Sequence, residues 1–406
     1  MHKFTFIPED ILFCKDGRPM TGTTGYGATL PAPHIISSSI LSALHRNDID
    51  DDAVALLEHR HHKGGFGSQT KAKASKEKSQ KFGSLKTVGP FPEYKGQVCY
   101  PTPRDLLSPG TKTALKPMTQ NLGKNNLPKN LKPLVSQIPP SKEKVPEWLC
   151  QDGWAQYLSG TSVSKEHFIN SNDLFAKEAH TGIGIDEKTG TTLKGQIYSA
   201  TRLRLSPDCR LTALAELKDN RGLEALEQLI PEDHKIMIGG ESRVCRMQRR
   251  KIREDGYLPK QTEVSGCSIK WVLLSPCLFP RIDLHTGGWL PNWISQEDYS
   301  VQILDGPGAN KARRLRVSPG KPIRAKLVSA LVGKPQVITG WSTLQNDEKR
   351  GGAKSTLLAV PAGSIYYFEA EDEEQAKKLA QALSFPNRRS TLMGEKGYGI
   401  GICTNY

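Results

Sequence analysis

Glycines near the C-terminus are the residues best spaced to bind a phosphate. Four of them alternate with a lysine and a tyrosine just before a final apolar run: Gly394, Lys396, Gly397, Tyr398, Gly399 and Gly401. Glycine leaves backbone N–H groups uncovered, so a phosphodiester can approach them while a lysine supplies charge. The same pattern is typical of an ordinary tight turn, and both interpretations stay open at this point.

Histidine could add cleavage chemistry to such a loop. A metal-independent ribonuclease needs a general base near the bound phosphodiester. His34, His45 and His180 are the candidates, and His34 stands at the start of a predicted helix. A histidine near a helix end also serves as a cap or a surface group. Asp186 has two interpretations as well, since an aspartate that cleaves RNA and a turn residue look alike here.

Metal and disulfide chemistry have weaker support. His59, His61 and His62 form an H-x-H-H run, but neither cysteine nor clustered carboxylate stands at ligand spacing nearby. The eight cysteines are scattered without a C-x-x-C pair, which is typical of reduced thiols in a cytosolic protein. We therefore expect no metal and no other cofactor.

Charge points to an anionic partner. The 406 residues carry a formal net charge of +14, which favours nucleic acid first and a membrane surface second. Residues 60–148 hold 17 Lys and Arg against 5 Asp and Glu, or +12 of that total. This stretch could be an arm that orders on RNA or a solvated loop. No apolar run reaches transmembrane length and no signal peptide precedes residue 20, so we expect a cytoplasmic protein without membrane contact.

The elements around these residues repeat one pattern. Near the C-terminus, residues 364–369 predict a strand, 371–383 an amphipathic helix and 400–404 a final strand. Residues 211–217, 221–229 and 235–238 predict strand, helix and strand again, followed by Gly239 and Gly240. This repetition predicts an α+β fold with two ferredoxin-like domains.

The domain boundaries follow from the composition. We expect a first domain of residues 1–58 and 149–260, a basic, loop-rich insertion of 59–148, and a second domain of 261–406. The first domain begins with two strand pieces in residues 2–15. It continues with a helix at 34–46 whose early turns carry Ser37, Ser38 and Ser39, where hydroxyls and free amides could hold phosphate or could simply start the helix.

Two basic clusters flank the expected domain junction. One is residues 243–253 and the other is 311–326. Either could be a solvated face, but two clusters near one junction favour a groove for a sugar-phosphate backbone. Between residues 179 and 205, strand-like pieces surround turns at 186–190 and 194–195, which predicts a projecting β-hairpin.

Seven segments, in this order, resemble a known family. They are ILFCKDGRPM at 11–20, the helix after Pro31 and Pro33, GPFPEYKGQVCYPTPRDLL at 89–107, HTGIGIDEKTGTTLKGQIYSATRLRL at 180–205, GWSTLQ at 340–345, AVPAGSIYYFE at 359–369 and GYGIGI at 397–402. The chain thus resembles the third subunit of the Cmr complex, a type III-B CRISPR effector whose RAMP-superfamily subunits have ferredoxin-like, RRM-like folds. The basic insertion has no counterpart in this resemblance.

The resemblance implies a non-catalytic RNA-binding subunit. It implies a hairpin thumb at about 180–205 and glycine-rich loops that hold the repeat-derived 5′ tag of the guide RNA. The implied partners are that tag, the large polymerase-like subunit and the first backbone subunit, in a hetero-oligomer for antiviral defence. The alternative from the same superfamily is a metal-independent endoribonuclease that processes guide-RNA precursors. Cys14 and Lys15 stand where the family pattern has an aromatic residue and an arginine.

Pattern and resemblance together predict one set of RNA-binding residues. No residue is predicted to be catalytic or to bind a metal. The predicted RNA-binding residues are Lys15, Arg18, Ser37, Ser38, Ser39, Arg46, His180, Thr181, Gly182, Ile183, Lys194, Gly239, Gly240, Arg243, Arg246, Arg313, Arg314, Lys396, Gly397, Tyr398 and Gly399.

Overall fold

The computed structural model describes most of the chain. The described residues are 1–15, 24–25, 29–47, 82, 84–112, 115–119, 126–128, 130–139, 143–218, 226–253, 256–342 and 352–406. Arg18 and the run His59, His61 and His62 lie outside them, as does much of the first half of the predicted insertion. None of the described helices is long and apolar enough to cross a membrane.

The N-terminal half is built on a large sheet with the first strand at its centre. β1 (His2–Pro8) pairs antiparallel with β11 (Cys209–Glu216) on one side and β13 (Val244–Lys251) on the other. The full strand order is β12-β13-β1-β11-β3-β4-β7-β8, with β12 at Asp233–Met237, β3 at Lys86–Tyr94, β4 at Gln97–Pro101, β7 at Trp148–Cys150 and β8 at Phe168–Ile169.

One helix covers one face of this sheet. α1 (Pro33–Asn47) buries Ile36 and Ile40 against Phe4 and Phe6, which alternate along β1. The alternation of apolar residues in β1 and their helical spacing in α1 are the local patterns that the sequence shows.

The C-terminal half has a smaller antiparallel sheet with its own helix. Its strand order is β17 (Ala325–Leu331), β22 (Ile365–Ala370), β14 (Ser268–Leu273), β23 (Gly401–Asn405). α6 (Glu373–Leu383) begins where the Asp372 carboxylate accepts the backbone N–H of Gln375 at 2.8 Å, and its apolar side packs on the sheet. The strand, helix and strand predicted near the C-terminus are all present within two residues of their expected bounds.

The other faces of the two sheets pack against each other. Val88, Phe91 and Leu214 from the N-terminal sheet share one core with Val272 and Tyr367 from the C-terminal sheet. α2 (Gln151–Leu158) closes this core with Trp154 and Tyr157. Much of the sheet face that an RRM-like domain would offer to RNA is therefore occupied by the other half of the chain.

The predicted insertion of residues 59–148 is only partly a loop. β3 and β4, at residues 86–101, lie inside the large sheet, where β3 pairs with β11. Val88, Phe91 and Tyr100 are buried there, so these strands belong to the core. Lysines dominate a count taken over the whole segment, although residues 87–100 by themselves have the pattern of strands.

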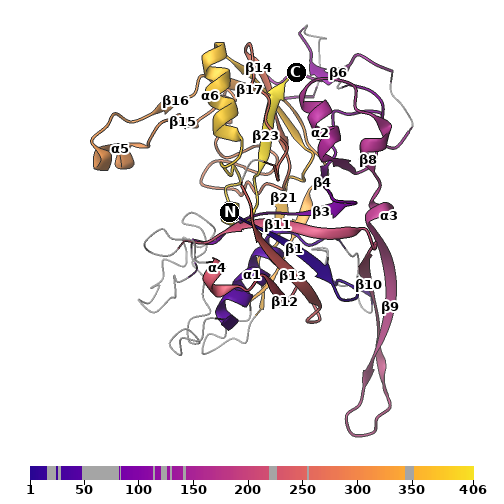
Figure 1. Ribbon diagram of the computed structural model, residues 1–406. Helices are drawn as coiled ribbons and strands as arrows, with labels where there is room; N and C mark the ends of the chain where they lie inside the picture. The colour runs from indigo at the N-terminus through magenta and orange to yellow at the C-terminus, as the bar shows by residue number, and fades with distance from the viewer. Residues whose placement is uncertain are drawn as a thin grey trace.

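Two parts project from the body (Figure 1). The hairpin of β9 (Phe175–Ile185) and β10 (Thr192–Leu205) begins five residues before the predicted thumb. At its tip the Asp186 carboxylate accepts the N–H of Lys188 at 2.8 Å, as a turn residue does. The second projection, here called the basic arm, is residues 304–322: β15 (Leu304–Asp305), α5 (Ala309–Leu315) and β16 (Lys321–Pro322).

Short elements complete the described chain. They are β2 (Thr24–Gly25), β5 (Leu115–Pro117), β6 (Leu134–Ser136), η3 (Lys165–His167), α3 (Ser171–Leu174), α4 (Leu226–Leu229), β18 (Gln336–Ile338), β19 (Trp341–Ser342), β20 (Gly352–Ala353), β21 (Leu357–Ala359) and η4 (Gly394–Lys396).

Candidate nucleic-acid interface

A cleft lies where the two halves of the chain meet. Its volume is about 270 Å³, and it is lined by Lys15, Thr29, Ala32, His34, Ile35 and residues 335–339. Lys15 follows the bridge that joins Phe13 to Gly239, His34 is the second residue of α1, and β18 forms the opposite wall. The cleft thus combines the first strand-turn and first helix of the N-terminal half with a loop of the C-terminal half.

Lysines give this cleft a positive field. Lys15 lines it, and Lys354 and Lys396 lie near enough to His34 to disfavour protonation of its ring. Burial lowers the pKa of the Lys396 ammonium, and the charge of Lys354 lowers it further, while Glu395 acts in the opposite direction. A phosphate near these ammonium groups would relieve their mutual repulsion, so an anionic ligand suits the cleft.

A tyrosine from the glycine-rich loop holds the histidine. The Tyr398 hydroxyl lies 2.7 Å from His34 Nδ1, and the two rings stack with centroids 6.1 Å apart. Burial raises the pKa of the Tyr398 phenol, so the phenol keeps its proton and is able to donate to Nδ1. In the tautomer in which Nδ1 accepts this hydrogen bond, the neutral imidazole carries its proton on Nε2. Burial, followed by Lys396 and Lys354, lowers the pKa of His34 to about 4.

This pKa shift predicts acid sensitivity. The unfolded chain protonates His34 near pH 6.5, whereas the folded chain does not until about pH 4. Stability contributed by the neutral ring is therefore present above pH 6.5 and lost as the pH falls towards 4, by roughly 3 kcal/mol in total. His34→Gln is expected to flatten this dependence in urea denaturation measured across that window. An unchanged slope in the variant would show that other groups govern the acid response.

The glycines of residues 394–401 are packed rather than open. A Cβ on Gly397 would lie 3.0 Å from the Gly89 carbonyl oxygen, and one on Gly399 would lie 2.0 Å from the Ser390 nitrogen. The Gly399 N–H donates to the Pro276 carbonyl at 2.9 Å, and the Gly397 N–H to Gly394 at 3.1 Å. These amides have partners within the chain, unlike the open donors that the sequence predicted.

Tyr398 and Lys396 differ in their burial. Tyr398 is fully buried, in a small cluster with Leu278, Ile338 and Leu392, so its ring has no face for a base. Lys396 is only partly buried and stays beside the cleft. Within the predicted glycine-rich site, Lys396 therefore stays a candidate for RNA contact, whereas Gly397, Tyr398 and Gly399 position α1 and His34.

The loop at Gly239 and Gly240 lies close to the cleft. Gly240 donates its N–H to the Phe13 carbonyl at 2.8 Å, next to Cys14 and Lys15. A Cβ on Gly239 would come within 2.5 Å of that carbonyl oxygen, so glycine is needed for the close approach. The structure thus brings Lys15, Gly239 and Gly240 together, as the sequence prediction requires.

The predicted hairpin residues are largely accessible. Thr181 is exposed, and Ile183 is 50% exposed opposite Ile197 on one face of the hairpin. Gly182 lies on the other face beneath the Tyr198 ring. His180 Nε2 lies 3.5 Å from Glu178 Oε2. The side chain of Lys194 lies outside the described structure.

The remaining predicted residues do not form one site. Ser37 and Ser39 are buried in the second turn of α1, so only Ser38 of the three faces solvent. Arg46 lies near the other end of the helix, about 18 Å along its axis from His34. Arg243 is paired with Glu241 at 2.7 Å. The others lie on surfaces away from the cleft: Arg246 on β13, and Arg313 and Arg314 on the basic arm.

Several cleft residues escaped the sequence prediction. Thr29, Gln336 and Thr339 come from loops or short strands whose composition has no distinguishing pattern. The same holds for Lys354, which lies near His34. The sequence suggested a catalytic base, a helix cap or a surface group for His34, and not an RNA contact. Their shared position depends on the packing of two halves, which no local window contains.

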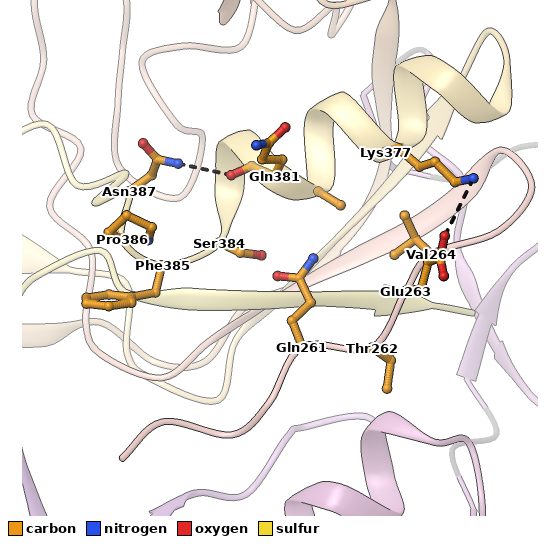
Figure 2. Close-up of a pocket in the computed structure, with 11 residues that line it drawn as sticks. Gln261, Thr262, Glu263, Val264, Lys377, Gln381, Ser384, Phe385, Pro386 and Asn387 are labelled. Atoms are coloured by element: carbon orange, nitrogen blue, oxygen red, sulfur yellow. Dashed lines mark hydrogen bonds and ion pairs between the residues drawn. The ribbon is translucent and has the colours of Figure 1, made fainter. Parts of the chain in front are cut away.

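Other candidate sites are less suitable. The hollow beside α6 (Figure 2) measures about 600 Å³, but its Lys377 is paired with Glu373 at 2.7 Å and approaches Glu263 at 3.9 Å. The groups that face it, such as Gln261 and Ser384, are mostly uncharged. Among the described residues, no group of three or more His, Cys, Asp or Glu could hold a metal ion.

Comparisons with known proteins show which protein family this chain resembles. The family model described as CRISPR-associated protein (Cas_Cmr3) matches residues 4–403. A search of curated proteins found no match. A solved type III-B Cmr-beta complex bound to cognate target RNA and AMPPnP contains a chain with 13% identity and a TM-score of 0.44, covering 90% of this chain and 86% of that one.

Two further solved structures show the same degree of likeness or less. A type III-B Cmr-beta complex bound to cognate target RNA gives 15% identity and a TM-score of 0.44, with 90% and 86% coverage. A Csm3-Csm4 subcomplex of the type III-A complex gives 10% identity and a TM-score of 0.35, with 92% and 94% coverage. The assignment of the family rests on the sequence model and not on these overlaps.

The chain is thus one of the CRISPR-associated proteins. Because the model spans nearly its whole length, the chain belongs to the Cas_Cmr3 family. The resemblance to the third subunit of the type III-B Cmr complex is confirmed, and the chain is a subunit of a type III CRISPR effector.

Proposed function

We propose that this subunit binds the repeat-derived 5′ tag of the guide RNA in the cleft between its two halves, without cutting it. The observation that carries the proposal is that Lys15 and His34 line one cleft, while Lys396 and Lys354 lie near enough to His34 to help lower its pKa. About 270 Å³ is room for part of a nucleotide, and three ammonium groups suit a sugar-phosphate backbone.

The hydrogen bonding of His34 suits recognition. In the tautomer in which Nδ1 accepts from Tyr398, the Nε2–H is a donor that can meet an acceptor on a base or sugar. Single-stranded tag nucleotides offer such edges because they are not paired. The hairpin lies on the same half of the molecule, and its exposed Thr181 and Ile183 extend the surface on which such a strand could lie.

The sheet topology supports two ferredoxin-like domains in this proposal. Across the N-terminal sheet, four strands lie in the order β13-β1-β11-β3, which are the fourth, first, third and second of the set along the chain. The C-terminal sheet repeats this arrangement as β23-β14-β22-β17. α1 follows the first strand of one set, and α6 follows the third strand of the other. Because these sheets pack face to face, RNA binds at the loops of the junction. Contact with the large subunit and the first backbone subunit completes the proposed role.

An endoribonuclease is the second candidate because His34 lies beside a glycine-rich loop. Its pKa of about 4 makes it a weak base at neutral pH, where efficient general bases have values near the working pH. Its Nδ1 is also occupied by the Tyr398 hydroxyl. Both features favour binding over cleavage.

The test is binding of the purified chain to an RNA that carries the 5′ tag, beside a scrambled RNA, over a salt series. Lys15→Ala and Lys396→Ala are each expected to weaken tag binding about ten-fold and to reduce the salt slope by about 0.7. Lys260→Ala is the matched control, because Lys260 is exposed and does not line the cleft, and this variant is expected to bind as the wild type does.

Denaturing gels of the same samples report on cleavage. Intact RNA with tag-selective binding supports the proposal. RNA that is cut by the wild type and stays intact with His34→Ala would establish the nuclease instead. Equal loss of affinity in all three lysine variants would mean that binding follows net charge and not the cleft.

A further inference from the structure

The basic arm of residues 304–322 has no task in RNA binding at the cleft. It lies on the C-terminal half and extends away from both sheets, with α5 at its far end (Figure 1). Five cations belong to it: Lys311, Arg313, Arg314, Arg316 and Lys321. All five side chains are exposed. Its acidic residue, Asp305, is already paired with Lys378 at 2.9 Å, so the positive charge of the arm is not balanced within it.

The arm has a defined shape. Its two strands pair through Leu304 with Pro322 and Asp305 with Lys321, and Gly320 donates its N–H to the Pro307 carbonyl at 2.9 Å. α5 ends at Arg316 in the left-handed conformation, where the Val317 N–H bonds to the Ala312 carbonyl at 3.0 Å. A preordered projection loses less conformational entropy on binding than a loose tail does.

Exposed aliphatic side chains accompany the cations. Leu315 is 53% exposed and Val317 is 52% exposed, on either side of Arg316 at the end of the helix. Phosphates need only the cations, and Leu315 and Val317 offer no aromatic or guanidinium plane on which a single-stranded base could stack. Apolar anchors next to arginines are typical of protein interfaces, where burial of the anchors supplies the binding energy.

We infer that the end of the basic arm docks into another protein subunit of the same complex, at an apolar groove bordered by Asp and Glu. Leu315 and Val317 fill the groove, and Arg313, Arg314 and Arg316 pair with the carboxylates at its rim. The inference rests on the proposed function in one respect, because the partner belongs to the effector complex. It adds the surface of this chain that makes the contact and the chemistry of the partner.

The test uses the complex assembled from co-expressed subunits and purified through this chain. Leu315→Asp with Val317→Asp, and separately Arg313→Glu with Arg314→Glu, are each expected to reduce retention of one and the same subunit by at least about ten-fold. Leu284→Asp is the matched control: Leu284 is 93% exposed outside the arm, and its replacement is expected to leave every subunit in place.

Two further measurements separate this inference from RNA binding. All arm variants are expected to bind the tag RNA as the wild type does, whereas the cleft variants lose that affinity. In the assembled wild-type complex, a photo-crosslinking residue at position 315 is expected to label a protein subunit. Full retention of all subunits, or crosslinks to RNA together with weaker RNA binding by the arginine variant, would overturn the inference.

Discussion

Lys270→Met is expected to lower the free energy of unfolding by about 3–5 kcal/mol, the usual cost of leaving one charge of a buried pair alone. Lys270 Nζ lies 2.5 Å from Asp105 Oδ2, and both side chains are almost fully buried between the two halves of the chain. Burial lowers the pKa of the Lys270 ammonium, and the charge of Asp105 opposes this. Methionine fills the same space but leaves the Asp105 carboxylate without its nearest cation.

Urea denaturation measures this effect. Lys326→Met on β17, in the same sheet, is the matched control, because the Lys326 side chain is 62% exposed and its removal should cost less than about 1 kcal/mol. Adding Asp105→Leu to Lys270→Met is expected to restore part of the loss, since an apolar pair needs no compensation. A Lys270→Met protein as stable as Lys326→Met would show that the interface tolerates the Asp105 carboxylate without Lys270.

Gly399→Ala is expected to have the second largest effect, a loss of several kcal/mol together with loosening of the junction. The added Cβ would lie 2.0 Å from the Ser390 backbone nitrogen, and Gly399 has φ +76°. Gly399 cannot shift freely, because its N–H donates to the Pro276 carbonyl and its own carbonyl accepts the Arg389 N–H, both at 2.9 Å. Since this loop holds Tyr398 against His34, tag affinity should fall as well.

The matched control is Gly308→Ala. Gly308 has open space where a Cβ would stand and no positive φ, so its replacement should change stability by less than about 0.5 kcal/mol. Thermal denaturation of both variants, with tag binding below the transition, separates packing from recognition. A Gly399→Ala protein of full stability that nevertheless fails to bind tag RNA would return these glycines to the direct RNA contact that the sequence predicted.

Local patterns predicted the elements that build the site. The alternation in residues 2–7 predicted β1, the apolar spacing in 34–46 predicted α1, and the acidic first turn before Ala376 predicted α6. Each of these predictions depends only on the spacing of residue types within a short window. The basic run at 243–253 misled the prediction, since it forms strand β13 with Cys245 and Met247 turned into the core.

The sequence alone determined the charge of Lys15 and Lys396 and the local elements around them. It also determined the family, because seven segments resemble that family in the same order. The tertiary structure decided what the glycines do. Gly397 and Gly399 suit a phosphate or a tight junction equally well until the neighbours Gly89 and Ser390 are known. It also decided that Lys354 lies near His34 and that Tyr398 is buried, because burial and electrostatic fields arise from contacts between residues hundreds of positions apart.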